Sequence, residues 1–326
     1  MIIKDKTIFV LGAGASNPFG YPTGDELKKI ICKELNPSQI AEQLVGTHSR
    51  DMIPYEKIKI ENFKNFFDKS VENSIDLFLK NNPDLRDLGK KLIAIILFQK
   101  EHELSLLNKE EPKNWYIEFW NMIDHNFENI NKHNMHFITF NYDRSLEHFL
   151  ITALYNSYAG KKTVAECASK VNLIDIIHVY GCLAPLPWQN QGEGRDYSGR
   201  WASHEDVINA AKNLFVIEEE RINDVRSVKL DRLKSLIKEA VYIYFFGFAY
   251  GEENLEILGG SFDNANLIWG TSLGLGEVAK NKIKKLIREK KSVRKGVCIL
   301  ENILVDRVKL FDVDVKEFLR QHIYLS

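Results

Sequence analysis

Short apolar runs recur along the chain and are separated by longer amphipathic segments. Several of these runs are continuous and rich in β-branched or aromatic residues, a pattern typical of strands buried on both faces of a sheet. The predicted strands are Thr7–Leu11, Met135–Phe140, Ile174–Val179, Leu214–Ile217, Val241–Phe246 and Leu267–Trp269. Because helical periodicity fills most of the intervals, the pattern predicts an α/β fold with a Rossmann-like, doubly wound parallel sheet.

One interval is too long for a simple strand–helix repeat. Between Asp25 and Lys132 the sequence has helical periodicity and no convincing strand. Apolar side chains recur there at helical spacing, and we expect a core made of Phe63, Phe66, Phe67, Val71, Ile75, Phe78, Trp115, Phe119, Met122 and Ile123. We therefore predict a helical subdomain, residues 25–133, inserted into a Rossmann-like domain formed by residues 1–24 and 134–326.

Two further segments differ from the rest in composition. Residues 184–201 are rich in glycine and proline and predict a long surface loop or a mobile lid. Residues 279–295 carry many lysines around a few apolar positions, which is typical of a solvent-exposed helix face. A docking surface for an acidic partner or for nucleic acid stays open there.

Composition narrows the class of protein. The 326 residues have a formal net charge of −1, which favours neither nucleic acid nor a membrane surface as a general partner. The longest apolar stretch, Leu92–Phe98, is far shorter than the roughly 20 residues of a membrane-spanning helix. The four cysteines form no pair at zinc-binding spacing, so we expect no metal site. With no secretion signal at the N-terminus, we expect a cytoplasmic protein.

A glycine-rich turn follows the first predicted strand. Gly12 and Gly14 have no side chain to obstruct the backbone, so an anion such as a pyrophosphate could approach the N–H groups there. A tight strand–helix turn without a ligand is an equally good interpretation. Asn17 stands where a dinucleotide-binding dehydrogenase has its third glycine, and no Gly-Lys-Ser/Thr follows, so neither a hydride-transfer enzyme nor a P-loop is favoured.

Small or polar residues also follow four other apolar runs. They are Asn141 and Asp143 after the second predicted strand, His178, Tyr180 and Gly181 at the third, Gly247 after the fifth, and Gly270, Thr271 and Ser272 at the last. Each has an ordinary structural interpretation, such as a helix N-cap or a turn. In a doubly wound sheet, however, the carboxyl ends of the strands surround the ligand site, and these residues would meet there.

The order of these segments resembles the sirtuin family, and more closely the sirtuin-like domains of prokaryotic antiphage defence proteins. The segments are GAGAS at 12–16, FNYD at 140–143, a strand with a histidine and a glycine, and FFGFAYGEENLEIL at 245–258. The resemblance implies that NAD is bound. The residues implied are Gly12, Ala13, Gly14 and Ser16 for the pyrophosphate, Asn141 for the ribose and the attacking water, Asp143 for the nicotinamide amide, and Gly247, Thr271 and Ser272 for the ribose and adenosine side.

Two departures from the family pattern change the expected activity. The chain lacks the four-cysteine zinc module and the Asp-Phe-Arg that follow in deacylating sirtuins, so the acyl-lysine side of the site has no counterpart. The family's histidine usually stands directly before the glycine, where this chain has Tyr180. His178 lies two residues earlier, on the same face of a strand and about 6–7 Å away. We expect His178 to act as the catalytic partner; Tyr180 as its substitute, or loss of the base, stays open.

These features together predict an enzyme that hydrolyses NAD to nicotinamide and ADP-ribose without a metal. The resemblance further implies a gated effector of antiphage defence, controlled through homo-oligomerisation or a partner such as an ATPase or sensor protein. Two alternatives stay open: a catalytically silent subunit that senses NAD or ADP-ribose, and an NAD-dependent protein deacylase.

Overall fold

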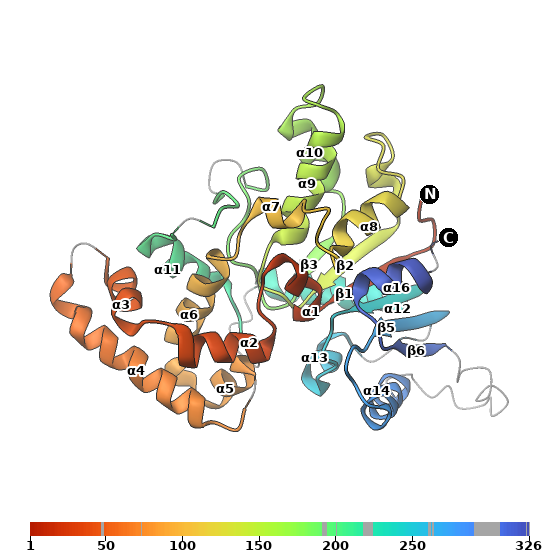
Figure 1. Cartoon of the computed structure of the whole chain (residues 1–326). Coiled ribbons are helices and arrows are strands. Elements are labelled where there is room, and N and C mark those ends of the chain that lie inside the picture. Colours follow the sequence, from red (N-terminus) through yellow and green to blue (C-terminus); the bar gives the residue numbers. More distant parts are fainter. Residues whose placement is uncertain are drawn as a thin grey trace.

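The computed structural model describes residues 1–46, 49–72, 74–190, 194–199, 201–217, 224–259, 262, 264–289, 307–323 and 325. Its central element is a parallel sheet in the order β3-β2-β1-β4-β5-β6 (Figure 1). The strands are β1 Thr7–Leu11, β2 Met135–Thr139, β3 Ile176–His178, β4 Tyr242–Phe246, β5 Leu267–Thr271 and β6 Val308–Phe311. This is the strand order of a doubly wound Rossmann sheet, which confirms the predicted fold class.

Helices surround the sheet and extend to one side of it (Figure 1). They are α1 Ala13–Ser16, α2 Gly24–Lys29, α3 Pro37–Val45, α4 Ile53–Lys69, α5 Ile75–Asn81, α6 Arg86–Phe98, α7 Glu103–Leu106, α8 Trp115–Met122, α9 Ser145–Ser157, α10 Val164–Val171, α11 His204–Asn213, α12 Asp224–Glu239, α13 Glu252–Ile257, α14 Glu277–Glu289 and α16 Val315–Gln321. Within the described ranges, no helix is long and apolar enough to cross a membrane.

The predicted strands are confirmed at five positions, with small shifts at their ends. The prediction of a strand at Leu214–Ile217 is wrong. Leu214 and Val216 are buried, but the segment is irregular. Its Phe215 N–H donates to Tyr180 O, in the turn after β3, at 2.8 Å. The apolar side chains of this segment are therefore buried without strand pairing. The short edge strand β6 was not predicted.

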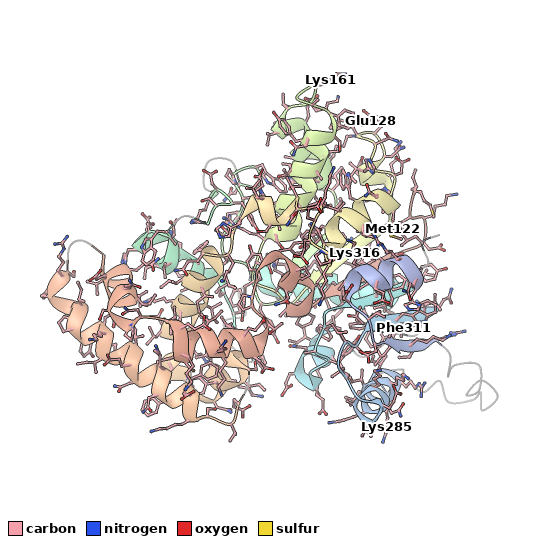
Figure 2. The ribbon with its side chains drawn as sticks, viewed as in Figure 1. Met122, Glu128, Lys161, Lys285, Phe311 and Lys316 are labelled. Carbon is pink, nitrogen blue, oxygen red and sulfur yellow. The ribbon has the colours of Figure 1, made fainter. Side chains whose placement is uncertain are left out.

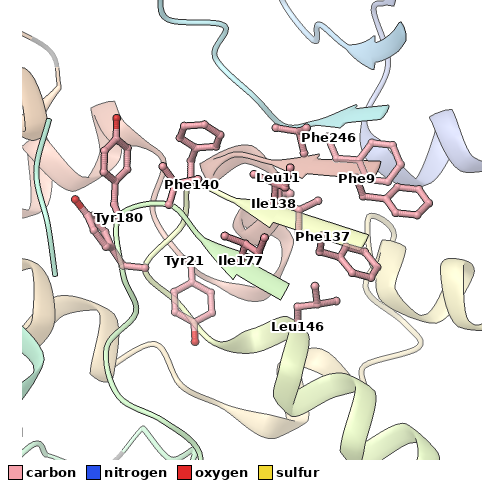
Figure 3. Close-up of a cluster of buried hydrophobic side chains, with 14 of the residues drawn as sticks. Phe9, Leu11, Tyr21, Phe137, Ile138, Phe140, Leu146, Ile177, Tyr180 and Phe246 are labelled. Carbon is pink, nitrogen blue, oxygen red and sulfur yellow. The ribbon is translucent and has the colours of Figure 1, made fainter. Parts of the chain in front are cut away.

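Aromatic rings from neighbouring strands form the centre of the core. The ring of Phe9 lies 5.2 Å from that of Phe137 and 5.5 Å from that of Phe246, on the two strands beside β1 (Figure 3). Phe119 of α8 packs edge-on against Phe9 at 5.3 Å. The register explains this cluster, because Thr7–Leu11 pairs in parallel with Met135–Thr139 on one side and with β4 on the other.

The long interval after residue 24 contains helices and, in its described part up to Lys132, no strand, as predicted. The helices α2 to α6 lie beside the sheet, and α11, from much later in the chain, packs against α6 and α3 (Figure 1). In contrast, α8 packs against α16. The division of the chain at residues 24 and 133 stays a prediction.

Most of the predicted helical core is buried, Met122 is partly buried, and two residues are exposed. Phe63, Phe67 and Phe78 are buried and pack against one another. Phe66 is 56% exposed on α4, and Val71 is 94% exposed beyond the end of that helix, so the prediction of core positions there is wrong. Helical spacing alone does not determine which of two adjacent phenylalanines faces inward.

The basic segment begins within α14. Ile283 and Ile287 are buried on this helix, whereas Lys282 and Lys285 are exposed, and Figure 2 shows Lys285 on its outer side. The arrangement is that of an amphipathic helix with a solvated lysine face. Residues 290–295 of the predicted run lie outside the described residues, and a docking role for this face stays a prediction.

A buried ion pair organises the glycine- and proline-rich loop. The Arg144 and Glu101 side chains are both 0% exposed, and Arg144 Nε donates to Glu101 Oε1 at 2.7 Å. The same guanidinium donates to the carbonyl oxygens of Pro185 at 3.0 Å, Arg195 at 2.6 Å and Asp196 at 2.8 Å. The described residues of the loop at 184–201 are therefore held around one buried cation, which favours the surface-loop interpretation over a lid.

Replacing Arg144 should destabilise the whole fold. An Arg144→Leu substitution leaves Glu101 buried with fewer partners and removes the donor of the loop carbonyls, so we expect a loss of about 3–5 kcal/mol in the free energy of unfolding. The control is Arg232→Leu, since the Arg232–Asp175 pair is exposed and should contribute no more than about 1 kcal/mol. Urea denaturation measures both, and equal effects of the two substitutions would contradict the structural role of Arg144.

Candidate functional site

The glycine turn lies at the switch point of the sheet, where β1 and β4 are neighbours. The Gly12 N–H donates to Phe246 O at 3.0 Å, and the Gly14 N–H donates to Gly247 O at 3.0 Å. The turn after β1 thus packs directly on the turn after β4. Crevices at such a switch point, outside the carboxyl ends of the strands, are the usual ligand sites of doubly wound sheets.

This backbone contact explains why the turn needs glycine. A Cβ atom at Gly12 would lie 2.6 Å from Gly247 O and 2.7 Å from Phe248 Cα. Gly247 has a φ of +55°, and a Cβ there would lie 2.1 Å from Ala15 N. The tight-turn interpretation therefore accounts for these glycines, and the N–H groups of Gly12 and Gly14 are already used within the protein.

A cavity of about 610 Å³ opens beside the turn. Its walls come from the segments after β1, β4, β5 and β6 and from the first helical turns of the neighbouring helices. The lining residues include Ala13, Gly14, Asn17, Thr23, Asp25, Ser74, Lys113, Gly247, Phe248, Thr271, Ser272 and Asp314. The volume falls in the range of roughly 300–1,000 Å³ that is usual for sites of small molecules and cofactors.

One buried polar side chain that lines the cavity has no hydrogen-bond partner among the described residues. Ser272 is 3% exposed and lines the cavity, and its Oγ makes no hydrogen bond with the described residues. Its neighbour Thr271 differs, because its Oγ1 accepts the Gly247 N–H at 2.8 Å. A buried hydroxyl without a protein partner is uncommon in native proteins, and Ser272 Oγ is placed to hydrogen-bond a water or a ligand in the cavity.

The FNYD segment brings Asn141 to the other side of the glycine turn. Asn141 Nδ2 donates to Gly12 O and to Ser16 Oγ, each at 2.9 Å. Ser16 also hydrogen-bonds Asp143, which is 7% exposed and accepts the Ser145 N–H at 3.1 Å. Burial raises the pKa of Asp143, against the opposing effect of the hydrogen bonds from Ser145 and Ser16. Three of the predicted residues, Ser16, Asn141 and Asp143, thus form one hydrogen-bonded group.

His178 lies next to this group but is fully engaged. Its Nδ1 is 2.9 Å from Asn141 O, and its Nε2 is 2.6 Å from Glu147 Oε1, so both ring nitrogens act as donors. Burial alone would lower the pKa of His178, but the charge and hydrogen bond of Glu147 raise it above its ordinary value. An acceptor at each ring nitrogen is the geometry of an imidazolium paired with the Glu147 carboxylate.

Glu147, on α9, was not predicted as a site residue. It is 4% exposed, and its Oε2 has no hydrogen-bond partner among the described residues. The signal in the sequence was a carboxylate among apolar residues, four positions after Asp143. Only the fold, which packs α9 beside β3, identifies its partner.

Tyr180 has a different environment from His178. The strand ends at His178, so Tyr180 lies in the following turn. Its O–H donates to Asn254 Oδ1 on α13 at 2.6 Å, and its ring is 5.8 Å from that of Phe140 (Figure 3). Neither Tyr180 nor His178 lines the cavity.

The predicted residues thus fall into two groups. Ala13, Gly14, Gly247, Thr271 and Ser272 line the cavity. The residues Gly12, Ser16, Asn141, Asp143, His178 and Tyr180 lie around or behind the glycine turn. Over the part of the chain that the structure describes, no three His, Cys, Asp or Glu side chains lie close enough together to hold a metal ion.

Comparison with known proteins finds similarity among solved structures. No family model matches the chain, and no curated protein matches it. Among solved structures, the chain is similar to Sir2 in complex with the inhibitor EX-527, 2′-O-acetyl-ADP-ribose and a deacetylated p53 peptide. The identity is 15% and the TM-score 0.34, with 97% of this chain and 91% of that chain covered. The fold assignment rests on the strand order of the chain itself.

A methyl group at Gly12 should disturb the switch point. The atoms that a new Cβ would meet belong to backbone, which cannot move aside as a side chain does, so we expect Gly12→Ala to cost about 1–3 kcal/mol of unfolding free energy. Gly24→Ala is the matched control, because no atom lies within 4 Å of its added Cβ, and it should change stability by less than about 1 kcal/mol. Thermal denaturation compares the two. A neutral Gly12→Ala would contradict the close backbone contact.

His178, paired with Glu147, and His148, whose Nε2 lies 2.9 Å from Glu103 Oε2, should titrate on opposite sides of the ordinary histidine value of 6.5. The charged and polar groups facing His178 are Glu147, Asp143 and the Asn141 carbonyl, and its pKa is raised. The pKa of His148 is lowered by burial despite the Glu103 carboxylate beside it. NMR titration of the ring protons measures both values, and Glu147→Gln should lower the midpoint of His178 alone.

The raised pKa of His178 determines how the free energy of unfolding depends on pH. Because the folded pKa of His178 lies above the unfolded one, the ion pair contributes fully below about pH 6.5 and its contribution is lost as the pH rises through the folded pKa. A midpoint for His178 below that of an unfolded histidine would contradict the ion pair.

Proposed function

We propose that the protein binds NAD at the switch-point cavity and hydrolyses it to nicotinamide and ADP-ribose. The observation that supports this most directly is the hydrogen-bonded group of Asn141, Ser16 and Asp143 beside the glycine turn. A cavity of suitable size with an unpartnered hydroxyl at Ser272 adjoins it. The resemblance of the GAGAS and FNYD segments to sirtuins supports NAD as the nucleotide.

The proposed reaction needs few protein groups. The bond between the ribose C1′ and the nicotinamide nitrogen breaks, and a bond from C1′ to a water oxygen forms. The water proton passes to solvent, and nicotinamide leaves as a neutral molecule, so no general acid is required. The site must orient the water and stabilise the positive charge that develops at the ribose.

Asn141 is suited to orient the water or a ribose hydroxyl. Its Nδ2 must face Gly12 O, because a carbonyl oxygen can only accept, and it also donates to Ser16 Oγ. The amide orientation is thus determined, and Oδ1 is left to accept a hydrogen bond from the substrate. Asp143, joined to the same Ser16, adds a carboxylate near the developing cation.

The environment of His178 supports a positioning role instead of a general base. An imidazolium paired with Glu147 cannot take a proton from water until it has lost its own. Its Nδ1–H, however, donates to Asn141 O and fixes the backbone of the catalytic segment. We therefore assign His178 the role of holding Asn141 in place.

The biological setting in this proposal comes from the same sequence resemblance. A cytoplasmic enzyme that depletes NAD would harm its own cell, so its activity would be gated. We propose that it acts as an effector of antiphage defence, activated through assembly of several copies or through a partner ATPase or sensor protein.

A second function is favoured by the environments of Tyr180 and His178. Tyr180 replaces the family's usual histidine and is bonded to Asn254, while His178 is engaged at both nitrogens. A site with no free base could bind NAD or ADP-ribose without cleaving it. On this alternative, the protein is a nucleotide sensor or scaffold subunit.

Substitution of Asn141 tests the proposed catalytic centre. Loss of one pre-organised polar group at a reacting centre typically lowers kcat by about 10²–10³-fold, and we expect that loss in nicotinamide release by Asn141→Ala. ADP-ribose binding, measured by calorimetry, should persist because the cavity lining is intact. The control is Asn156→Ala, an exposed asparagine on α9, which should retain full activity.

The outcomes separate the two functions. Full turnover by Asn141→Ala would show that the catalytic centre lies elsewhere. Binding of ADP-ribose by the wild type, without nicotinamide release at any protein concentration or with any candidate partner, would support the silent sensor and contradict hydrolysis.

A further inference from the structure

The glycine turn offers little to a diphosphate. A dinucleotide brings two negative charges, and backbone N–H groups of glycine-rich turns commonly bind them. In this chain, the Gly12 N–H donates to Phe246 O, the Gly14 N–H to Gly247 O and the Ala15 N–H to Gly12 O. Those three donors are satisfied by the protein itself, and a backbone N–H group carries no formal charge, so a cationic side chain has to neutralise the diphosphate.

Lys113 is the one cationic side chain among the described residues that line the cavity. It is exposed, and its Nζ forms no ion pair with any residue that the structure describes. Asp25 and Asp314 line the same cavity, so without Lys113 the charged side chains there would all be acidic. An unpaired lysine at the mouth of a site is available to an anionic ligand.

The segment that carries Lys113 is attached directly to the glycine turn. The next residue, Asn114, is 1% exposed, and its Nδ2 donates to Leu106 O at 2.9 Å and to Asn108 O at 3.0 Å. Trp115 follows, fully buried, and its indole Nε1 donates to Ala15 O at 2.7 Å. The backbone at Lys113 is therefore fixed beside α1, while the flexible side chain reaches the cavity.

We propose that Lys113 is the phosphate-binding residue of this site. Its ammonium group neutralises the diphosphate of NAD or ADP-ribose, and the unpartnered Ser272 Oγ hydrogen-bonds the same ligand from the β5 side of the cavity. The charge thus comes from the segment before α8 and not from the glycine turn. This inference rests on the proposed nucleotide site and specifies which side chain selects a phosphorylated ligand.

Binding of two ligands that differ in their phosphates tests the proposal. Charge-assisted contacts of this kind correspond to about a 10- to 100-fold change in affinity. We expect Lys113→Gln to weaken ADP-ribose binding by that factor in calorimetry and to leave adenosine binding within about twofold. Lys113→Arg should retain most of the affinity for ADP-ribose, because the charge is kept.

Lys109→Gln is the matched control. Lys109 is an exposed lysine four residues earlier on the same segment and does not line the cavity. Its substitution should change neither affinity. The loss on Lys113→Gln should also shrink as KCl is raised, since salt screens the interaction with an exposed charge.

The possible failures are distinguishable. Unchanged ADP-ribose affinity in Lys113→Gln would overturn the role of Lys113 and leave the proposed function standing. Equal losses for ADP-ribose and adenosine would mean that Lys113 has only a structural role, which also overturns the proposal. A wild-type protein that binds neither ADP-ribose nor NAD would overturn the nucleotide site itself, and the proposed function with it.

Discussion

The backbone contact between the turns after β1 and β4 is the constraint on which the rest of the site depends. At Gly12 and Gly247 the two turns approach so closely that no side chain fits between them. The contact aligns the carboxyl ends of the two central strands and sets the floor of the cavity. It also uses the Gly12 and Gly14 N–H groups, which a glycine-rich turn would otherwise present to a phosphate. One contact therefore determines both where a ligand can bind and which groups remain to bind it.

The two sides of this contact differ in chemistry. On the side of β5 and β6 the cavity is open and has an unpartnered hydroxyl at Ser272. On the side of β2 and β3 the polar groups are joined to one another: Asn141 and Asp143 through Ser16, and His178 to Glu147. The first side suits recognition of a nucleotide, and the second suits orientation of a few atoms at a reacting bond. Because the two sides differ in this way, the site is consistent both with binding a nucleotide and with cleaving it.

The sheet could be predicted from the sequence because its central strands are continuous apolar runs that the fold buries completely. Every residue of Thr7–Leu11 and of Tyr242–Phe246 is buried. The same signal failed at Leu214–Ile217, where apolar side chains are buried in an irregular segment. It also missed Val308–Phe311, an edge strand with three partly exposed residues and therefore no continuous apolar pattern.

The candidate site could be predicted only in part, for a related reason. Residues that follow strands, such as Asn141 and Ser272, are identified by their position in the chain, because all parallel strands end at one edge. Glu147 and Lys113 could not be identified by their position in the chain, because they lie on a helix and on a connection and reach the site only through the packing of the fold. The sequence also did not show that Gly12 is needed for close backbone packing, because Gly247, against which it packs, is far away in the sequence.

In the proposed reaction, water cleaves NAD at this site. The most direct measurement is the reaction of NAD with the purified protein in ¹⁸O-labelled water, across protein concentrations at which copies could assemble. Hydrolysis predicts equal amounts of nicotinamide and ADP-ribose, with one ¹⁸O atom in each ADP-ribose. Intact NAD at every concentration, despite measured nucleotide binding, would contradict hydrolysis and identify the protein as a binder.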